Sequence, residues 1–184
     1  MAPGRKPPQE PVRPGPGVSF VAIDFETADA GRDSACAVAL VRVEQGRVVE
    51  KFAHLVRPPR PTFSGFNIAV HGIRWRDVQH QPTFGDLWPD VRGILDGVDV
   101  LYAHNMSFDK SVLRAVCGVY GVAMPEMEYR CTVSLARAVW GIRPTKLPNV
   151  CDYLGLALRH HDALSDAEAC AGIVLAAGSD QRIL

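Results

Sequence analysis

Four carboxylates in this chain stand where ordered segments are expected to begin or end. Asp24 and Glu26 close the apolar run "FVAIDFE", and their spacing of two places both side chains on one face of a strand. Asp109 and Asp166 each lie in the first turn of a segment with helical spacing. Clustered acids repel one another unless cations lie between them, and their hard oxygens suit Mg²⁺ or Mn²⁺. Two such ions about 4 Å apart would clamp the attacking and leaving oxygens of a phosphodiester.

The stretch "LRHHDALSDAEAC" places two histidines beside the last of these acids. Asp162 is expected to be the N-cap of a helix from Ala163, because its carboxylate can accept backbone N–H groups of the first turn. His161 is then N′ and Asp166 is N4, two positions that meet at a helix start. We therefore expect His161 to converge on Asp166, and His160 to point elsewhere. By itself, the segment is more typical of an ordinary capped helix than of a catalytic site.

Composition indicates one soluble globular domain. The 184 residues are 47% hydrophobic and 22% charged, and 20 basic residues balance 20 acidic ones. This balance argues against non-specific coating of DNA, but not against an enzyme with a local basic surface. Residues 130–160 carry such an excess of basic residues, with Asp152 as their one acid, although a solvated helix face explains it equally well.

Cysteine usage and the chain ends bear on the compartment. The five cysteines are odd in number and contain no Cys-x-x-Cys pair, so we predict buried, reduced thiols in a cytoplasmic protein. No apolar stretch reaches transmembrane length, and no membrane partner is expected. Residues 1–17 are rich in Pro and Gly and predict a disordered tail, and residues 180–184 form a short C-terminal end.

The elements that would position the acids follow from the periodicity of residues 18–179, which we predict to be one domain. Expected strands are 18–25, 35–44, 47–56, 98–105 and 127–132. Expected helices are 83–97, 107–121, 132–141, 146–156 and one that begins at Ala163. Three strands followed by alternating helices and strands predict an α/β fold, with a mixed β-sheet of about five strands, the first three antiparallel, and helices on both faces.

The sequence leaves the starts of two helices undecided and predicts one long loop. Pro89 falls inside the helix expected at 83–97, so that helix can also begin at Pro89. Ser107 is a possible N-cap for the helix that carries Asp109. Residues 57–67, "RPPRPTFSGFN", are expected to form a loop.

Taken together, the motifs resemble the DEDDh-type 3′→5′ exonucleases of the DnaQ-like family, the DNA polymerase III epsilon-subunit-like group. The motifs are "FVAIDFETA", "YAHNMSFDKSVL" and "HHDALSDAEAC", in that order, and the segments "VHGIRWRDV" and "KLPNVCDYLGL" are also similar to family segments. The resemblance covers roughly residues 20–175. It implies a ribonuclease H-like fold. It also favours a catalytic role for the stretch "LRHHDALSDAEAC", which by itself was more typical of an ordinary capped helix.

The resemblance implies a role for each motif residue. Asp24, Glu26, Asp109 and Asp166 would bind two Mg²⁺ or Mn²⁺ ions, with Asp24 shared by both. His161 would act as general base on the attacking water, because neutral imidazole is available near neutral pH. The terminal phosphodiester would then be hydrolysed to release a 5′-mononucleotide.

Substrate contacts are expected around the same motifs. Phe25, Glu26 and Thr27 would hold the 3′-terminal nucleotide, and Phe25 and Phe108 would stack on bases, with a place in the hydrophobic core as the alternative for each ring. Asn105 would orient a phosphate or support Asp109. Candidates for contact with the nucleic-acid backbone, each also explained by ordinary solvent exposure, are Arg57, Arg60, Arg143 and Lys146.

One departure from the family pattern bears on the biological role. "DFETADAGRDSAC" lacks the Thr-Gly that often follows the first motif of the replicative proofreading subunit, and resembles a stand-alone bacterial subgroup. We expect a 3′ end of nucleic acid as substrate, most of all single-stranded DNA, and a DNA polymerase subunit is a possible partner. The alternatives are an exoribonuclease acting on RNA ends, an endonuclease of the wider ribonuclease H-like fold, and a catalytically idle nucleic-acid-binding module.

Overall fold

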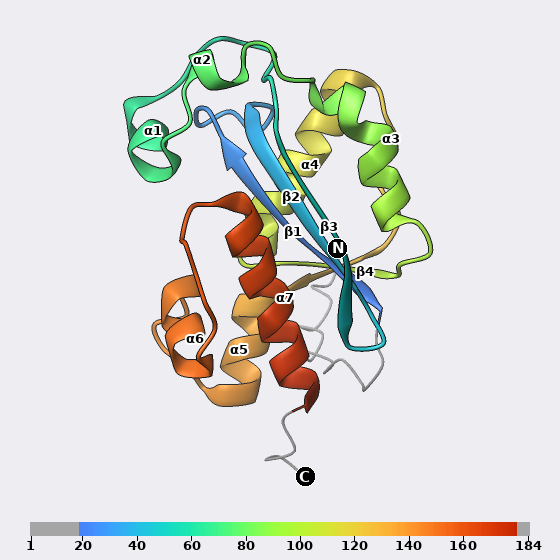
Figure 1. Cartoon of the computed structure of the whole chain (residues 1–184), viewed down its shortest axis with the longest axis vertical. Helices are drawn as coiled ribbons and strands as arrows, with labels where there is room; N and C mark the ends of the chain where they lie inside the picture. The colour runs from blue at the N-terminus through green and yellow to red at the C-terminus, as the bar shows by residue number, and fades with distance from the viewer. Residues whose placement is uncertain (1–18, 180–184) are drawn as a thin grey trace, which may run out of the picture.

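The computed structural model describes residues 19–179, and the tail expected at 1–17 and the end at 180–184 lie outside the described residues. Its centre is a five-stranded sheet with the order β3-β2-β1-β4-β5 (Figure 1). The strands are β1 (Phe20–Thr27), β2 (Ala35–Glu44), β3 (Arg47–Leu55), β4 (Val100–Ala103) and β5 (Glu128–Cys131). The first three are antiparallel, whereas β4 and β5 run parallel to β1. The predicted mixed sheet is therefore confirmed.

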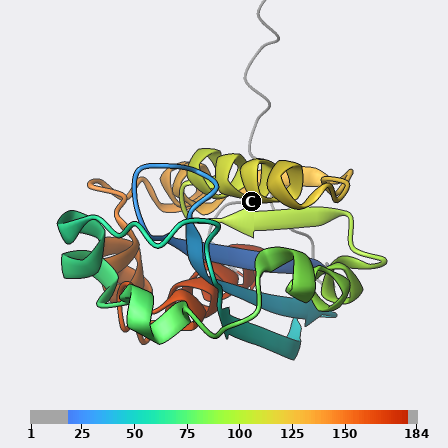
Figure 2. The same cartoon turned by 90° about the horizontal axis from the view of Figure 1, so that it is seen from above.

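Helices cover both faces of this sheet, as predicted (Figures 1 and 2). The helices α3 (Phe84–Leu95) and α4 (Met106–Tyr120) pack on one face with the odd-numbered apolar residues of β1. The other face is covered by α7 (Ala163–Ser179), with α5 (Thr132–Trp140) and α6 (Leu147–Leu154) beside it. Because both faces are buried, β1 is apolar on each side until Asp24 and Glu26 appear near its end.

Two short helices lie in the connection between β3 and α3, above the end of β1 (Figure 1). They are α1 (Gly65–His71) and α2 (Trp75–Val78). The expected loop at 57–67 is therefore wrong in its last residues, because Ser64 caps α1 by accepting a hydrogen bond from the backbone N–H of Asn67 at 3.1 Å. No residue of α1 is buried, and its seven residues are too few for their apolar spacing to distinguish a helix from a loop.

The starts of α3 and α4 differ from the expected ones. Helix α3 begins at Phe84 and not at Pro89, because Thr83 and Asp86 form a capping box in which each backbone N–H bonds to the other side chain. Helix α4 is capped by Asn105 and not by Ser107. Asn105 adopts the left-handed conformation, with φ of 82°, which Asn tolerates better than most residues, and its side chain accepts a hydrogen bond from Ser107 Oγ.

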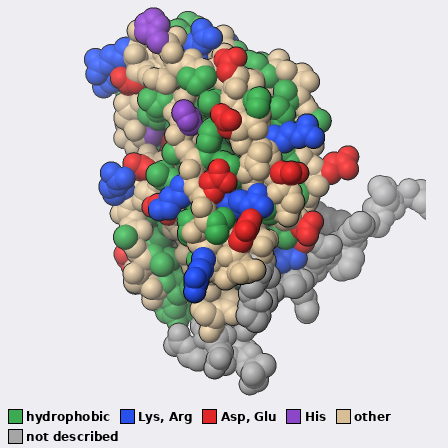
Figure 3. All heavy atoms as spheres, turned by 45° about the vertical axis from the view of Figure 1, so that its right-hand side comes forward, with side chains coloured by type: hydrophobic (Ala, Val, Ile, Leu, Met, Phe, Trp, Pro, Cys, Tyr) green, Lys and Arg blue, Asp and Glu red, His purple; other side chains and the backbone are tan. Residues whose placement is uncertain are grey.

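Surface and interior features agree with an ordinary globular domain. All five cysteines are free, and four of them are buried. Among the described residues, no helix combines the length and apolarity needed to cross a membrane. The face shown in Figure 3 carries acidic and basic side chains interspersed with apolar ones. Charge on that face is therefore not gathered into a basic stripe of the kind that binds a polyanion.

Candidate active site

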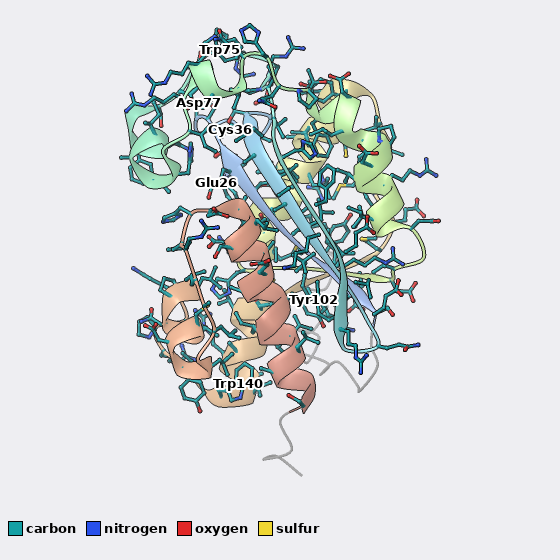
Figure 4. The ribbon with its side chains drawn as sticks, in the orientation of Figure 1. Glu26, Cys36, Trp75, Asp77, Tyr102 and Trp140 are labelled. Carbon is teal, nitrogen blue, oxygen red and sulfur yellow. The ribbon has the colours of Figure 1, made fainter. Side chains whose placement is uncertain are left out.

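The four predicted carboxylates meet where three elements converge. The end of β1 supplies Asp24 and Glu26 on the face covered by α7, and the first turn of α7 supplies Asp166. Oxygen atoms of these three residues lie within 4.8 Å of one another. Asp109 arrives from the first turn of α4, where its Oδ1 accepts a hydrogen bond from the backbone N–H of Phe25 at 3.2 Å. Figure 4 marks Glu26 at the end of β1, between α1 and the start of α7.

Burial and mutual repulsion disfavour ionisation of these acids. Burial raises the pKa of Asp24 well above its usual range, and Asp109, Asp166 and Glu26 add to the effect. Burial, with the charges of Asp166 and Asp109, raises the pKa of Glu26 to about 8. Burial also raises the pKa of Asp109 to about 7, although the Phe25 N–H works in the opposite direction. A cation bound among these carboxylates would therefore stabilise their ionised forms.

The donor atoms of this group fit a hard divalent cation. Asp166 is 5% exposed, and its Oδ1 is buried without a hydrogen-bond partner among the described residues. An unsatisfied buried carboxylate oxygen costs about 1–3 kcal/mol or more, whereas coordination to a cation removes that cost. Oxygen-only donors of this kind suit Mg²⁺ or Mn²⁺. The residues present thus fit the ions that the sequence motifs imply.

The start of α7 is built as predicted. Asp162 Oδ1 accepts the backbone N–H of Ser165 at 3.1 Å, and its carbonyl accepts that of Asp166 at 2.9 Å. The backbone N–H of His161 reaches back to Asp166 Oδ2 at 3.2 Å. His161 and Asp166 therefore do converge, while Asp162 serves as the cap.

The expected orientation of His160 is wrong. Its Nδ1 lies 3.0 Å from Asp166 Oδ2, and its ring stacks on that of His161 with 3.8 Å between centroids. The reason is the backbone of His161, whose φ of 68° belongs to the left-handed region and turns the chain sharply before the helix. Both imidazoles consequently face the start of α7.

His161 has the properties that a general base needs. Its pKa is lowered, first by burial and then by the neighbouring His160, so the neutral ring dominates near pH 7. No hydrogen bond joins its ring nitrogens to another side chain or to the backbone within residues 19–179. The lone pair of His161 is therefore available to a water molecule or a substrate group.

A cavity of about 370 Å³ opens onto the acidic group. Thr27 and Phe108, both predicted to bind substrate, line it, and Arg32 lies 4.5 Å above the Phe108 ring. The remaining lining residues are Asp24, Phe25, Glu26, Phe66, Asn67, Val70, His71, His104, Lys146, Leu147, His160, His161 and Asp166. Lys146 is the one among the four predicted backbone-contacting cations that borders this cavity.

Two residues that were predicted to contact substrate, Phe25 and Asn105, do not present their side chains to the cavity as expected. The side chain of Phe25 is 3% exposed and packs against Phe84, with 6.0 Å between ring centroids, so its ring takes the place in the core that was the alternative. Asn105 is exposed, caps α4 and does not border the cavity. What Phe25 contributes to the site is its backbone N–H, which holds Asp109.

Sequence reasoning missed an aromatic wall supplied by α1. Phe66 is 79% exposed and borders the cavity, on a different element from Phe108. Asn67 and His71 fix α1 to the end of β1, since Asn67 Nδ2 donates to the Thr27 carbonyl at 2.7 Å and His71 Nε2 lies 3.1 Å from the same oxygen. The segment "VHGIRWRDV" was a signal for His71, but nothing in the residue pattern singled out Phe66.

His104 stands beside Asn105 in the second motif, was given no role from the sequence, and has a positioning role in the structure. Its Nδ1 lies 2.9 Å from Thr132 Oγ1, and its Nε2 lies 3.1 Å from the Thr145 carbonyl. Burial lowers its pKa to about 4, so the ring is neutral and donates from Nε2. His104 thereby ties the end of β4 to the residue that precedes Lys146.

Comparison with known proteins identifies the family. The exonuclease family RNase_T matches residues 21–174, and the chain belongs to this family. The DNA polymerase III PolC-type protein of Thermotoga petrophila is 30% identical over 161 residues, which are 85% of this chain and 12% of that protein. Exodeoxyribonuclease 10 of Escherichia coli K12 is 35% identical over 148 residues, 75% of this chain and 59% of that protein. The chain therefore spans less than two thirds of either relative.

A solved structure supports the same assignment. Exonuclease X in complex with 5′ overhanging duplex DNA superposes with a TM-score of 0.71 and 28% identity, covering 86% of this chain and 90% of that one. The ribonuclease H-like fold and the DnaQ-like DEDDh family that the motifs resembled are thus confirmed.

Proposed function

We propose that the chain is a metal-dependent 3′→5′ exonuclease that hydrolyses the terminal phosphodiester of single-stranded DNA and releases 5′-mononucleotides. One observation carries the proposal: oxygens of Asp24, Glu26 and Asp166 lie within 4.8 Å of one another, around a buried carboxylate oxygen that has no partner among residues 19–179. An arrangement this costly is expected where cations are bound for catalysis.

Asp24, Glu26, Asp109 and Asp166 would hold two Mg²⁺ or Mn²⁺ ions, with Asp24 shared between them. Such ions, when bound, lower the pKa of water and stabilise negative charge on the reacting phosphate. The raised pKa values of Glu26 and Asp109 support this assignment, because without a bound cation these carboxylates would be protonated over much of the range up to neutral pH.

His161 would accept a proton from the attacking water. The water oxygen forms a bond to the terminal phosphorus as the bond from phosphorus to the O3′ of the penultimate nucleotide breaks. O3′ leaves with the shortened strand and takes up a proton, and the product carries a 5′-phosphate. The lowered pKa and uncommitted ring nitrogens of His161 support this role, which requires neutral imidazole.

Single-stranded substrate is favoured because two aromatic rings, the exposed Phe66 and the half-buried Phe108, border the acidic cavity from different elements. Phe66 on α1 and Phe108 on α4 offer faces on which unpaired bases can stack. Thr27 and Lys146 border the same cavity, and Lys146 would pair with a phosphate. A cytoplasmic location and association with a DNA polymerase belong to the proposal as well, the latter because the PolC-type relative is a polymerase.

A ladder assay tests this function. The purified chain is incubated with 5′-labelled single-stranded DNA and RNA of one sequence, in Mg²⁺ and in EDTA. The proposal expects a descending ladder that EDTA abolishes, with DNA degraded faster. Faster degradation of RNA would make the chain an exoribonuclease, and absence of cleavage in Mg²⁺ and Mn²⁺ would contradict the proposed activity.

A further inference from the structure

A nitrogen-rich group of ligands lies on one side of the acidic site. His160, His161 and Asp166 each offer a ligand atom, and the three atoms lie within 4.8 Å of one another. The two imidazoles stack with their planes 22° apart. The two rings are therefore stacked face to face next to one carboxylate. The proposed hydrolysis needs only one histidine as its general base.

The spacing inside this group is close to that around a four-coordinate metal ion. His160 Nδ1 and Asp166 Oδ2 are 3.0 Å apart, with one proton shared between them. In a tetrahedral zinc site with bonds of about 2.0–2.1 Å, neighbouring ligand atoms are separated by about 3.3 Å. A metal ion can thus replace the shared proton if the two side chains move apart by a few tenths of an ångström.

A second observation is that some ligand atoms of this group have no hydrogen-bond partner among the described residues. Asp166 is 5% exposed, and its Oδ1 has no hydrogen-bond partner within the described part of the chain. The ring nitrogens of His161 are likewise not bonded to any other residue between 19 and 179. The group therefore contains a carboxylate oxygen and an imidazole without partners among the described residues, on side chains whose ligand atoms lie within 4.8 Å of one another.

We propose that His160, His161 and Asp166 form a binding site for one transition-metal ion of the Zn²⁺ class, and that its occupancy inhibits the enzyme. Two imidazoles and one carboxylate match the preference of Zn²⁺ for nitrogen and oxygen ligands, whereas Mg²⁺ selects oxygen donors. The ion ties up the His161 lone pair and displaces Asp166 from the Mg²⁺ centre. The inhibition rests on the proposed function, but the binding does not.

His160 is the residue that distinguishes this site from the Mg²⁺ centre. Its side chain is 37% exposed, so replacement by Gln is expected to remove an imidazole without opening the hydrophobic core. His80, an exposed residue that follows α2, provides a matched control, because His80→Gln removes one imidazole elsewhere. Thermal unfolding of each variant verifies that it is folded.

Binding is measured with Co²⁺, which substitutes for Zn²⁺ and absorbs strongly in the visible range when it is four-coordinate. The metal-stripped full chain is titrated with Co²⁺, and Zn²⁺ is then added in competition. We expect one ion per chain to give the four-coordinate band, with affinity at least tenfold weaker in H160Q and unchanged in H80Q. Absence of the four-coordinate band, or equal affinity in H160Q and the unmodified chain, would overturn the proposal.

An activity arm separates this inference from the proposed function. Each chain is assayed in excess Mg²⁺ with increasing Zn²⁺, and its rate is expressed relative to its own rate without Zn²⁺. The half-inhibitory Zn²⁺ concentration is expected to rise at least tenfold in H160Q and to stay the same in H80Q. Co²⁺ binding without any Mg²⁺-dependent cleavage supports the site and contradicts the exonuclease, whereas cleavage without Co²⁺ binding does the reverse.

Discussion

Nδ1 of His160 lies 3.0 Å from Oδ2 of Asp166, on the oxygen that also accepts the backbone N–H of His161. Both bonds leave Oδ1 of the same carboxylate without a partner among the described residues, and they fix its direction. His160 is therefore a positioning residue for Asp166, in addition to its proposed role in binding Zn²⁺. A hydrogen bond to a charged group is worth about 1.5–3 kcal/mol, so its loss should be measurable.

His160→Ala should weaken Mg²⁺ binding and lower kcat/KM by about ten- to a hundredfold, which corresponds to that range of energies. The measurement is a Mg²⁺ titration of initial rates. His160→Asn, which can present an amide donor near Asp166, should recover part of the loss. An alanine variant with unchanged Mg²⁺ dependence would show that Asp166 does not need this partner.

His161→Ala should lower kcat by about 10²–10⁴, the usual contribution of a general base, because the neutral ring at the helix start is removed. Its affinity for Mn²⁺, measured by calorimetry, should stay close to that of the unmodified chain, since the proposed oxygen ligands are retained. The pH–rate profile should also lose its acidic limb. If kcat changes less than threefold, His161 is not the base.

The stability of the metal-free chain should fall as pH rises. The pKa of Glu26 is raised to about 8 and that of Asp109 to about 7, mainly by burial. Above the ordinary pKa of a carboxylate and below these values, the folded state holds protons that the unfolded state has released, so the free energy of unfolding decreases with pH. Urea denaturation in EDTA should show this decrease between about pH 5 and pH 8, and a plateau above.

Two additions make the pH experiment decisive. Mg²⁺ at saturating concentration should remove most of the slope, because it binds the ionised carboxylates and only in the folded state. Glu26→Gln should reduce the slope in EDTA, since the amide does not titrate, and Asp109 should account for part of the slope that remains. A free energy of unfolding that stays constant or rises across this window would mean that the acids are not destabilising in the absence of metal.

Phe66→Ala should raise KM for single-stranded DNA with little change in the free energy of unfolding. The ring is 79% exposed and borders the cavity, so its loss removes base stacking worth about 1–3 kcal/mol without opening the core. Tyr153→Ala is the control, because Tyr153 is another exposed aromatic residue, on α6 and outside this cavity. Equal KM values in the two variants would remove Phe66 from the substrate site.

The elements that bury an apolar face were predictable from sequence. Strand β2 spans Ala35–Glu44 as expected, and α7 begins at Ala163 because Asp162 caps it. The face of Phe25 was also predictable, since a period of two places it opposite Asp24 and Glu26, in the core. Helix α1 was not predictable, because it packs through polar bonds such as that from Asn67 to Thr27 and buries no residue of its own.

The candidate site was predictable in its acids and less so in its histidines. Three motifs brought the four carboxylates together as expected, because strand ends and helix starts converge at one edge of the sheet. Which ring faces Asp166 depends on the φ angle of His161, and a non-glycine residue in the left-handed region leaves no mark in the sequence. Phe66 depends on how α1 folds over β1, which is tertiary information.

We propose above all that the four carboxylates form a metal-dependent centre for hydrolysis of nucleic-acid ends. Its most direct test compares the rate of 5′-mononucleotide release in Mg²⁺ by the unmodified chain and by Asp24→Asn, with folding of the variant verified by thermal unfolding. Loss of the ligand that we propose to be shared by two ions should remove several kcal/mol of transition-state stabilisation, about a thousandfold in rate or more. An Asp24→Asn variant that releases mononucleotides within tenfold of the unmodified rate would contradict the account.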